Sequence, residues 1–209
     1  MREIAPGIFH WRTFHQPIGA EVSSYYVEPA GIVIDPKVPE GGLDALPGRP
    51  QQVVMTSGLH DRDVREVAEA LRIPVRAPRE ARDRLGDRLA IDQPYRGGEE
   101  IAPGVTAIEI GRLCPDEYAL HIAVDEGAIA FADAVTRYGD ALGFFPDDLL
   151  GDDPQAVKNG LRRALGGLLA RDFDHLLFAH GEPLVGGGKA ALREFVGNPV
   201  GHEDFGQAL

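Results

Sequence analysis

Histidine and aspartate supply most of the side chains in this sequence that could do chemistry. The segment Thr56-Ser57-Gly58-Leu59-His60-Asp61-Arg62 places a hydroxyl, an imidazole, a carboxylate and a guanidinium next to one another. Two further segments, Phe131-Ala132-Asp133 and Phe178-Ala179-His180, each place one such residue after a short apolar run. Imidazole and carboxylate groups bind zinc, iron and manganese and move protons in hydrolysis. These three segments are therefore the first candidates for a functional site.

Thiol and serine chemistry have weaker support. The sequence has one cysteine, Cys114, which excludes an internal disulfide and any metal site built from several thiolates. We interpret Cys114 as a small packing residue near the candidate pocket. Ser57 and His60 form no recognisable nucleophile motif, because the serine is not part of a G-x-S-x-G turn.

The composition limits the classes of partner. The chain has 209 residues, of which 44% are hydrophobic and 26% charged, and its formal net charge is −12. This is the composition of a packed globular protein, and the negative charge disfavours nucleic acid and anionic membrane surfaces as partners. The sequence shows neither a signal peptide nor an apolar run of roughly 20 residues, so we expect a soluble cytoplasmic protein. A small-molecule ligand fits this picture, and the oligomeric state does not follow from the sequence.

Strands and helices come in two consecutive half-sets. Each half-set has a meander of short β-rich runs followed by helical patterns, which favours two mixed sheets packed together with helices outside. We expect one domain over residues 1–197 and a loosely held tail over 198–209. The expected strands are Ile8–Phe14, Val22–Glu28, Gly31–Asp35, Gln52–Thr56, Pro74–Ala77, Gly104–Ile110, Tyr118–Val124, Ala128–Phe131 and His175–Ala179, and the expected helices begin near Val64, Arg79, Asp153 and Lys189.

This order of segments resembles the metallo-β-lactamase superfamily. The resemblance extends from Ile4-Ala5-Pro6-Gly7-Ile8 to Val196, and Ile32-Val33-Ile34-Asp35-Pro36 resembles the end of the family's third strand. It implies an α/β (α+β) fold in four layers, an αβ/βα sandwich. It also implies that Asp133 is the family's bridging aspartate and that His180 is its last histidine.

The metal-binding loop departs from the family pattern, which reads Thr-His-x-His-x-Asp-His. Aligned on Thr56 without a gap, three of its histidines are replaced by Ser57, Leu59 and Arg62, and Asp61 is kept. The family's next histidine falls at Arg112. The resemblance therefore implies a reduced ligand set of Asp61, Asp133 and His180.

Two outcomes for this pocket remain open at the level of the sequence. In the first, no cofactor is bound, and Arg62 and Arg112 pair with Asp61 and Asp133 in place of the missing cations. In the second, one zinc, iron or manganese ion is held by Asp61, Asp133 and His180. His60 is expected to be hydrogen-bonded at the start of a helix, although a slip of one residue in the turn would make it a further ligand.

The expected function follows the same division. We expect a relative of the metallo-hydrolases with a decayed metal site, which binds a small anionic ligand or a partner without catalysing a reaction. Its pocket would include Ser57, Leu59, His60, Asp61, Arg62, Arg112, Asp133 and His180. The alternatives are a mononuclear metal-dependent hydrolase of an ester, thioester or lactone, and a structural or oligomeric module whose pocket is closed by salt bridges.

Overall fold

The first half of the chain forms a seven-stranded sheet. The computed structural model describes residues 1–198. The strands follow one another in sequence order; the first four are antiparallel, and the later ones run parallel to their neighbours. The strands are β1 (Arg2–Ala5), β2 (Ile8–His15), β3 (Ala20–Val27), β4 (Ile32–Ile34), β5 (Gln52–Val54), β6 (Val75–Pro78) and β7 (Gln93–Tyr95).

The second half forms a five-stranded sheet in the order β14-β11-β10-β9-β8. Only β14 is parallel to its neighbour, β11, and the other pairs are antiparallel. Its strands are β8 (Glu100–Ala102), β9 (Val105–Glu109), β10 (Tyr118–Ile122), β11 (Ala128–Phe131) and β14 (His175–Leu177). A separate hairpin pairs β12 (Thr136–Tyr138) with β13 (Ala141–Gly143).

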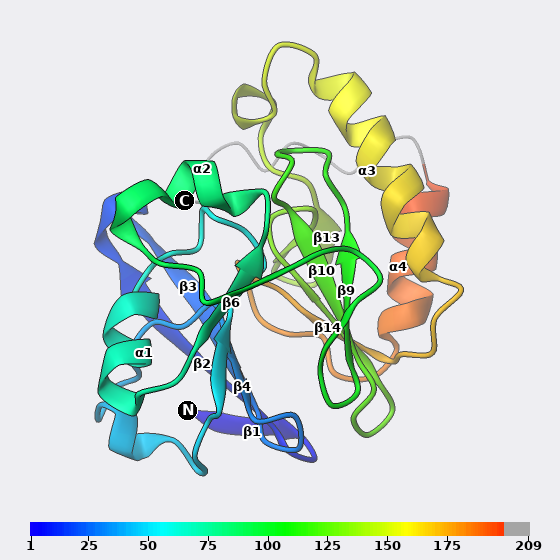
Figure 1. The fold of residues 1–209 in the computed structure, drawn as a ribbon. Helices are drawn as coiled ribbons and strands as arrows, with labels where there is room; N and C mark the ends of the chain where they lie inside the picture. Colours follow the sequence, from blue (N-terminus) through cyan, green and yellow to red (C-terminus); the bar gives the residue numbers. More distant parts are fainter. Residues whose placement is uncertain (199–209) are drawn as a thin grey trace.

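Helices cover the outer face of each sheet, which gives four layers (Figure 1). The helices α1 (Val64–Leu71) and α2 (Ala81–Leu85) pack on the first sheet, where Val64 and Val67 share a buried cluster with Val53. The helices α3 (Pro154–Leu168) and α4 (Gly188–Gly197) cover the second sheet in the same way. The predicted αβ/βα sandwich is therefore confirmed.

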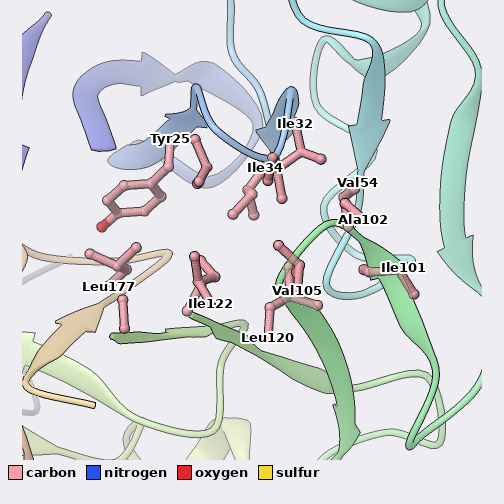
Figure 2. Close-up of a cluster of buried hydrophobic side chains, with 14 of the residues drawn as sticks. Tyr25, Ile32, Ile34, Val54, Ile101, Ala102, Val105, Leu120, Ile122 and Leu177 are labelled. Atoms are coloured by element: carbon pink, nitrogen blue, oxygen red, sulfur yellow. The ribbon is translucent and has the colours of Figure 1, made fainter. Parts of the chain in front are cut away.

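A third apolar cluster lies between the two sheets. Figure 2 shows Ile34 and Val54 of the first sheet facing side chains of the second, such as Leu120 and Ile122, and all four are at most 2% exposed. Burial of apolar area on this scale is the main free-energy contribution that holds the sheets together. Because a side chain at every second position of a strand points inward, each sheet supplies one row to this core and another to its helices.

The predicted helices and all nine predicted strands are present, with ends shifted by a few residues. The predictions omitted five short strands, namely β1, β7, β8, β12 and β13. Strand β7 contains Pro94 and two exposed residues at the edge of its sheet, so its sequence has no apolar alternation. The predicted tail, residues 198–209, lies outside the described residues apart from Asn198, and the single domain stays a prediction.

Hydrogen bonds join the two sheets at one edge. Ser23 donates its amide to the carbonyl of Ala179 at 2.9 Å, and Tyr118 donates its amide to the carbonyl of Thr56 at 2.9 Å. The Tyr25 hydroxyl donates to the carbonyl of Phe178 at 2.8 Å and accepts from its amide at 3.0 Å. These contacts hold the loops that follow β5 and β14 close together, and the candidate site lies there.

Candidate metal centre

Three ligand-type side chains converge where the two sheets meet. Oδ1 of Asp133 lies 3.3 Å from Nε2 of His60 and 3.4 Å from Nε2 of His180. One ligand atom from each of the three residues lies within 4.8 Å of the others. His60 follows β5, Asp133 follows β11 and His180 follows β14, so the site combines loops from both sheets.

A tight turn points His60 into the site. The amide of His60 donates to the carbonyl of Ser57 at 3.1 Å, and the amide of Val64 donates to the carbonyl of Asp61 at 2.9 Å. The turn places His60 inside, at 3% exposure, and leaves Asp61 half-buried. The one-residue slip is therefore what the structure contains, and the histidine takes the place expected for the aspartate.

Asp35 fixes the orientation of the His60 ring from behind. Oδ2 of Asp35 lies 2.9 Å from Nδ1 of His60, and Oδ1 accepts from the amide of Thr56 at 2.8 Å. The Thr56 hydroxyl also donates to Oδ2 of Asp35. When the ring gives up its second proton, the Nδ1 proton stays directed at Asp35 and Nε2 presents a lone pair on the side of Asp133. A carboxylate behind the ring is the usual outer support of a metal-binding histidine.

Opposing charges dominate the electrostatics of the cluster. Burial disfavours the charged form of His60, but the carboxylates of Asp35 and Asp133 overcome this and raise its pKa to about 9. Burial likewise disfavours ionised Asp133, yet the nearby His60 and His180 hold the pKa of its carboxyl well below the usual range. The site is therefore built to carry a negative charge on Asp133 beside a cation.

The donor set fits a single divalent ion. Apart from the contacts within the cluster at 3.3 and 3.4 Å, the buried atoms Nε2 of His60 and Oδ1 of Asp133 have no hydrogen-bond partner among the described residues. A tetrahedral ion at about 2.1 Å from each ligand would separate its ligands by roughly 3.4 Å, which matches the distances of 3.3 and 3.4 Å between the ligand atoms. Two imidazoles and one carboxylate suit zinc, iron or manganese.

Arg62 reaches the site but does not pair with its carboxylates. Its Nη1 donates to the carbonyls of Ser23 at 2.7 Å and Asp35 at 2.8 Å, and its Nη2 is buried without a partner among the described residues. Arg62 and Asp35 both adopt positive φ, at 25° and 45°. Residues other than glycine rarely adopt this conformation, which often accompanies functional sites. The guanidinium thus joins the middle of β3 to the residue that follows β4.

Two predicted site residues lie elsewhere. The carboxylate of Asp61 accepts a hydrogen bond from Nη1 of Arg88 at 2.8 Å on the surface, because the turn directs His60 inward instead. Arg112 is exposed, and its side chain lies over Gly160 of α3. The predicted pairing of Arg62 and Arg112 with Asp61 and Asp133 is therefore not what the structure contains.

Two adjoining cavities open onto the cluster. The larger has a volume of about 400 Å³, and the smaller about 240 Å³. They share Leu59, Asp133, Phe145 and Leu149. The larger is lined by His15, Ile18, Val22, Leu59, His60, Arg62, Asp133, Phe145, Leu149 and His180. The smaller is lined by Ser57, Leu59, Leu113, Cys114, Glu117, Ala132, Asp133, Phe145 and Leu149.

Reasoning from the sequence did not single out several of these residues. The sequence patterns mark Asp35 only as the end of a strand, and they do not mark Glu117 or Leu149. Glu117 lies in a loop whose single carboxylate carries no pattern, and Leu149 belongs to a segment otherwise dominated by aspartates. The one available signal was Asp35 at the end of an apolar strand, because a carboxylate there reaches the edge where site residues gather.

Comparison with known proteins rests on structure alone. No protein-family model matches the sequence, and neither does any curated protein. Among solved structures, the DIM-1 metallo-β-lactamase superposes with a TM-score of 0.69 at 14% identity, over 94% of each chain. A metallo-β-lactamase from Hirschia baltica superposes with a TM-score of 0.64 at 13% identity, over 95% of this chain and 94% of that one. A metallo-β-lactamase from Cronobacter sakazakii with a HARLDQ motif superposes with a TM-score of 0.57 at 18% identity, over 85% of this chain and 76% of that one.

These likenesses establish the fold. The two mixed sheets with helices on both outer faces agree with it. Among the described residues, none of the helices has the length and hydropathy that crossing a bilayer requires.

Proposed function

We propose that this chain, which has the metallo-β-lactamase fold, is a hydrolase with one divalent metal ion held by His60, Asp133 and His180. Its substrate would be an ester, thioester or lactone with an apolar acyl group. The observation that carries the proposal is the convergence of three ligand atoms within 4.8 Å of one another, with Oδ1 of Asp133 at 3.3 and 3.4 Å from the two imidazole nitrogens. Asp61, which the sequence offered as a ligand, is not part of this set.

A single ion is proposed because the other ligand positions are filled by side chains that bind metal poorly or not at all. Ser57, Leu59 and Arg112 stand where the resemblance places three histidines. Leu59 has no ligand atom, and Arg112 is exposed, with its side chain against Gly160 of α3. The remaining candidate is the Ser57 hydroxyl, which lies 3.9 Å from Sγ of Cys114. A neutral hydroxyl is a poor ligand for zinc.

The residues around that ion would have separate roles in the reaction. A bound divalent cation would act as a Lewis acid and lower the pKa of water towards about 7. Asp35 would hold His60 in the tautomer that presents Nε2. Phe145 packs edge-on against His180 with ring centroids 5.5 Å apart, which shields that ligand from bulk water.

The larger cavity supports the choice of an apolar acyl group. Ile18, Leu59 and Leu149 line it and are 48%, 49% and 56% exposed, and they belong to the few large apolar side chains exposed among the described residues. Single exposed apolar side chains are common on protein surfaces, but three of them around one cavity opening are typical of a binding site. Binding an acyl chain would remove this area from water.

The second candidate is the metal-free anion-binding protein that the sequence favoured. One observation supports it: Nη2 of Arg62 is buried, has no partner among the described residues, and belongs to a side chain that lines the larger cavity. A guanidinium in this position would hold a carboxylate or phosphate. In this form the protein binds its ligand without hydrolysing it.

Elemental analysis and hydrolysis assays separate the two candidates. The protein would be purified without a histidine tag and without chelator, its metal content measured, and a panel of acyl esters and thioesters assayed. We expect about one metal ion per chain, activity that a chelator removes, and recovery on adding one equivalent of metal. Metal far below one per chain, without stabilisation by added zinc, would contradict the hydrolase and leave the anion-binding candidate.

A further inference from the structure

The smaller cavity contains a carboxyl group that the proposed metal site does not use. Glu117, just before β10, is 1% exposed and lines this cavity together with Ser57 and Cys114. Because the two cavities share Leu59 and Asp133, the smaller one lies directly beside the proposed metal site. A substrate whose carbonyl sits at the cluster can place one part in each cavity.

Only half of the Glu117 carboxyl is engaged by the protein. Its Oε2 accepts from the amide of Leu113 at 3.2 Å, whereas Oε1 is buried without a partner among the described residues. The main chain of Glu117 is held firmly: its carbonyl accepts from the amides of Ile110 and Gly111 at 3.0 and 3.1 Å. A buried carboxyl oxygen without a partner costs free energy, so its position beside a reaction site calls for an explanation.

We propose that Glu117 is held as a neutral carboxylic acid and donates its proton to the leaving group of the substrate. This assignment rests on the proposed hydrolase function. Water would add to the acyl carbon and the bond from that carbon to the leaving oxygen or sulfur would break. The leaving atom would take the proton of Glu117, and a proton from the attacking water would restore the acid.

The surroundings of Glu117 favour its neutral form. Burial is the main cause: without a bound metal it raises the pKa of Glu117 to about 8, together with the carboxylate of Asp133 and against the amides of Leu113 and Arg112 and the His60 ring. When a cation neutralises Asp133, burial remains and still favours the neutral acid. Asp116 directs its carboxylate away, accepting from the amide of Gly58 at 2.9 Å and from Arg84. An acid with a pKa near the working pH is the most effective proton donor.

Cys114 is the other protic group in this cavity that could be considered, and it is a poor donor. Burial, followed by the contact with Asp116, raises the pKa of its thiol to about 12. The thiol therefore stays protonated and gives up its proton far less readily than Glu117. The hydroxyl of Ser57 donates no better and is already close to Sγ of Cys114.

The test compares two esters of the same apolar acid in the metal-loaded protein. Ethyl hexanoate has a strongly basic leaving alkoxide that needs a proton, whereas 4-nitrophenyl hexanoate has a stable leaving anion. Glu117→Gln preserves the acceptor for the Leu113 amide but removes the proton. We expect a loss in kcat of about 100-fold or more on the ethyl ester and of less than about 3-fold on the nitrophenyl ester.

Two further measurements accompany the kinetics. Metal content should be unchanged in Glu117→Gln, and infrared difference spectra at pH 7 should show a protonated carboxyl band in the wild type that the variant lacks. Glu109→Gln, which changes an exposed carboxylate at the end of β9, is the matched control and should leave both activities and the band unchanged.

The outcomes that overturn the assignment are distinct from those that overturn the function. Equal losses on both esters, or a Glu117 that is already ionised at pH 6, would refute the role of Glu117 while leaving the hydrolase in place. Failure of the metal-loaded wild type to hydrolyse either ester would refute the proposed function and the catalytic role together.

Discussion

The carboxylate of Asp35 lies 2.9 Å from Nδ1 of His60 and thereby joins the end of β4 to the loop after β5. Asp35 also accepts from the amide and the hydroxyl of Thr56, so one buried carboxylate organises the whole turn that carries His60. The orientation of the proposed ligand therefore depends on a residue that never touches the metal.

Replacing Asp35 should weaken metal binding without removing a ligand. Asp35→Asn loses the negative charge that fixes the His60 tautomer, so we expect zinc affinity to fall by about 10–100-fold. Competition with a chromophoric chelator measures this change. Asp63→Asn is the control, because Asp63 contacts Lys37 and Val38 and not the cluster. Equal zinc affinity in Asp35→Asn and the wild type would contradict the role of Asp35.

The identity of the ligands can be checked by comparing His180 with Asp61. His180→Ala should reduce zinc from about one per chain to near zero, because two ligands cannot hold the ion against buffer. Asp61→Ala should keep its zinc, since this carboxylate pairs with Arg88 on the surface. Elemental analysis after dialysis gives both values. Loss of zinc in Asp61→Ala would restore the ligand set implied by the sequence.

The fold was largely predictable because its determinants are local. Alternating or continuous apolar runs mark the strands, and apolar residues at helical spacing, such as Val64, Val67 and Ala68, mark the helices. The omitted strands β12 and β13 have three residues each and are stabilised by pairing with one another rather than by an apolar pattern.

The site was less predictable because it depends on one turn. Asp133 and His180 each follow an apolar strand that fixes their position, and the structure brings them together with His60. Between Thr56 and Val64 the direction of each side chain depends on which amides form hydrogen bonds within the turn. A turn has no regular apolar spacing from which these directions could be predicted. Hence His60 and Asp61 exchanged their expected places, and Arg62 bonded to main-chain carbonyls instead of carboxylates.

Acid should destabilise the fold through His10. Burial, only partly offset by Glu182, lowers the pKa of His10 from 6.5 to about 4, and the ring contacts Ser23 Oγ at 3.0 Å. Between pH 6.5 and 4 the unfolded chain binds a proton that the folded chain does not, so stability falls as the pH falls. At pH 5 the loss relative to pH 8 should be about 2 kcal/mol.

Urea denaturation at pH 8 and pH 5 measures this loss in variants. His10→Gln should lose less stability than the wild type over this range. His121→Gln is the control, because His121 lies on β10 at the far side of the second sheet and contacts the carbonyl of Asp172. If His10→Gln and the wild type lost the same free energy, another group would have to cause the acid sensitivity.

The apolar opening of the larger cavity should determine which acyl chains bind. Leu149→Ala removes half-exposed apolar area at this opening, so the KM for hexanoyl esters should rise by about 3–10-fold with little change for acetyl esters. Val185→Ala removes a similarly exposed side chain outside both cavities and should change neither value. Steady-state kinetics with hexanoyl and acetyl esters measures both KM values. An equal rise in KM for the two esters would contradict selection by chain length.

Gly181 should be essential because it places His180 against the β12–β13 hairpin. Its φ is +97°, and a Cβ there would lie 2.1 Å from the carbonyl oxygen of Arg137. Gly181→Ala must therefore move the loop after β14, which we expect to cost about 2–4 kcal/mol of stability and to displace the neighbouring ligand.

Gly19→Ala is the control: Gly19 also has positive φ, but its Cβ would meet no atom within 4 Å. Thermal unfolding and zinc content measure both effects. Because the control carries only the backbone strain, of about 1–2 kcal/mol, a Gly181→Ala variant no worse than Gly19→Ala would show that the contact with Arg137 does not hold His180 in place.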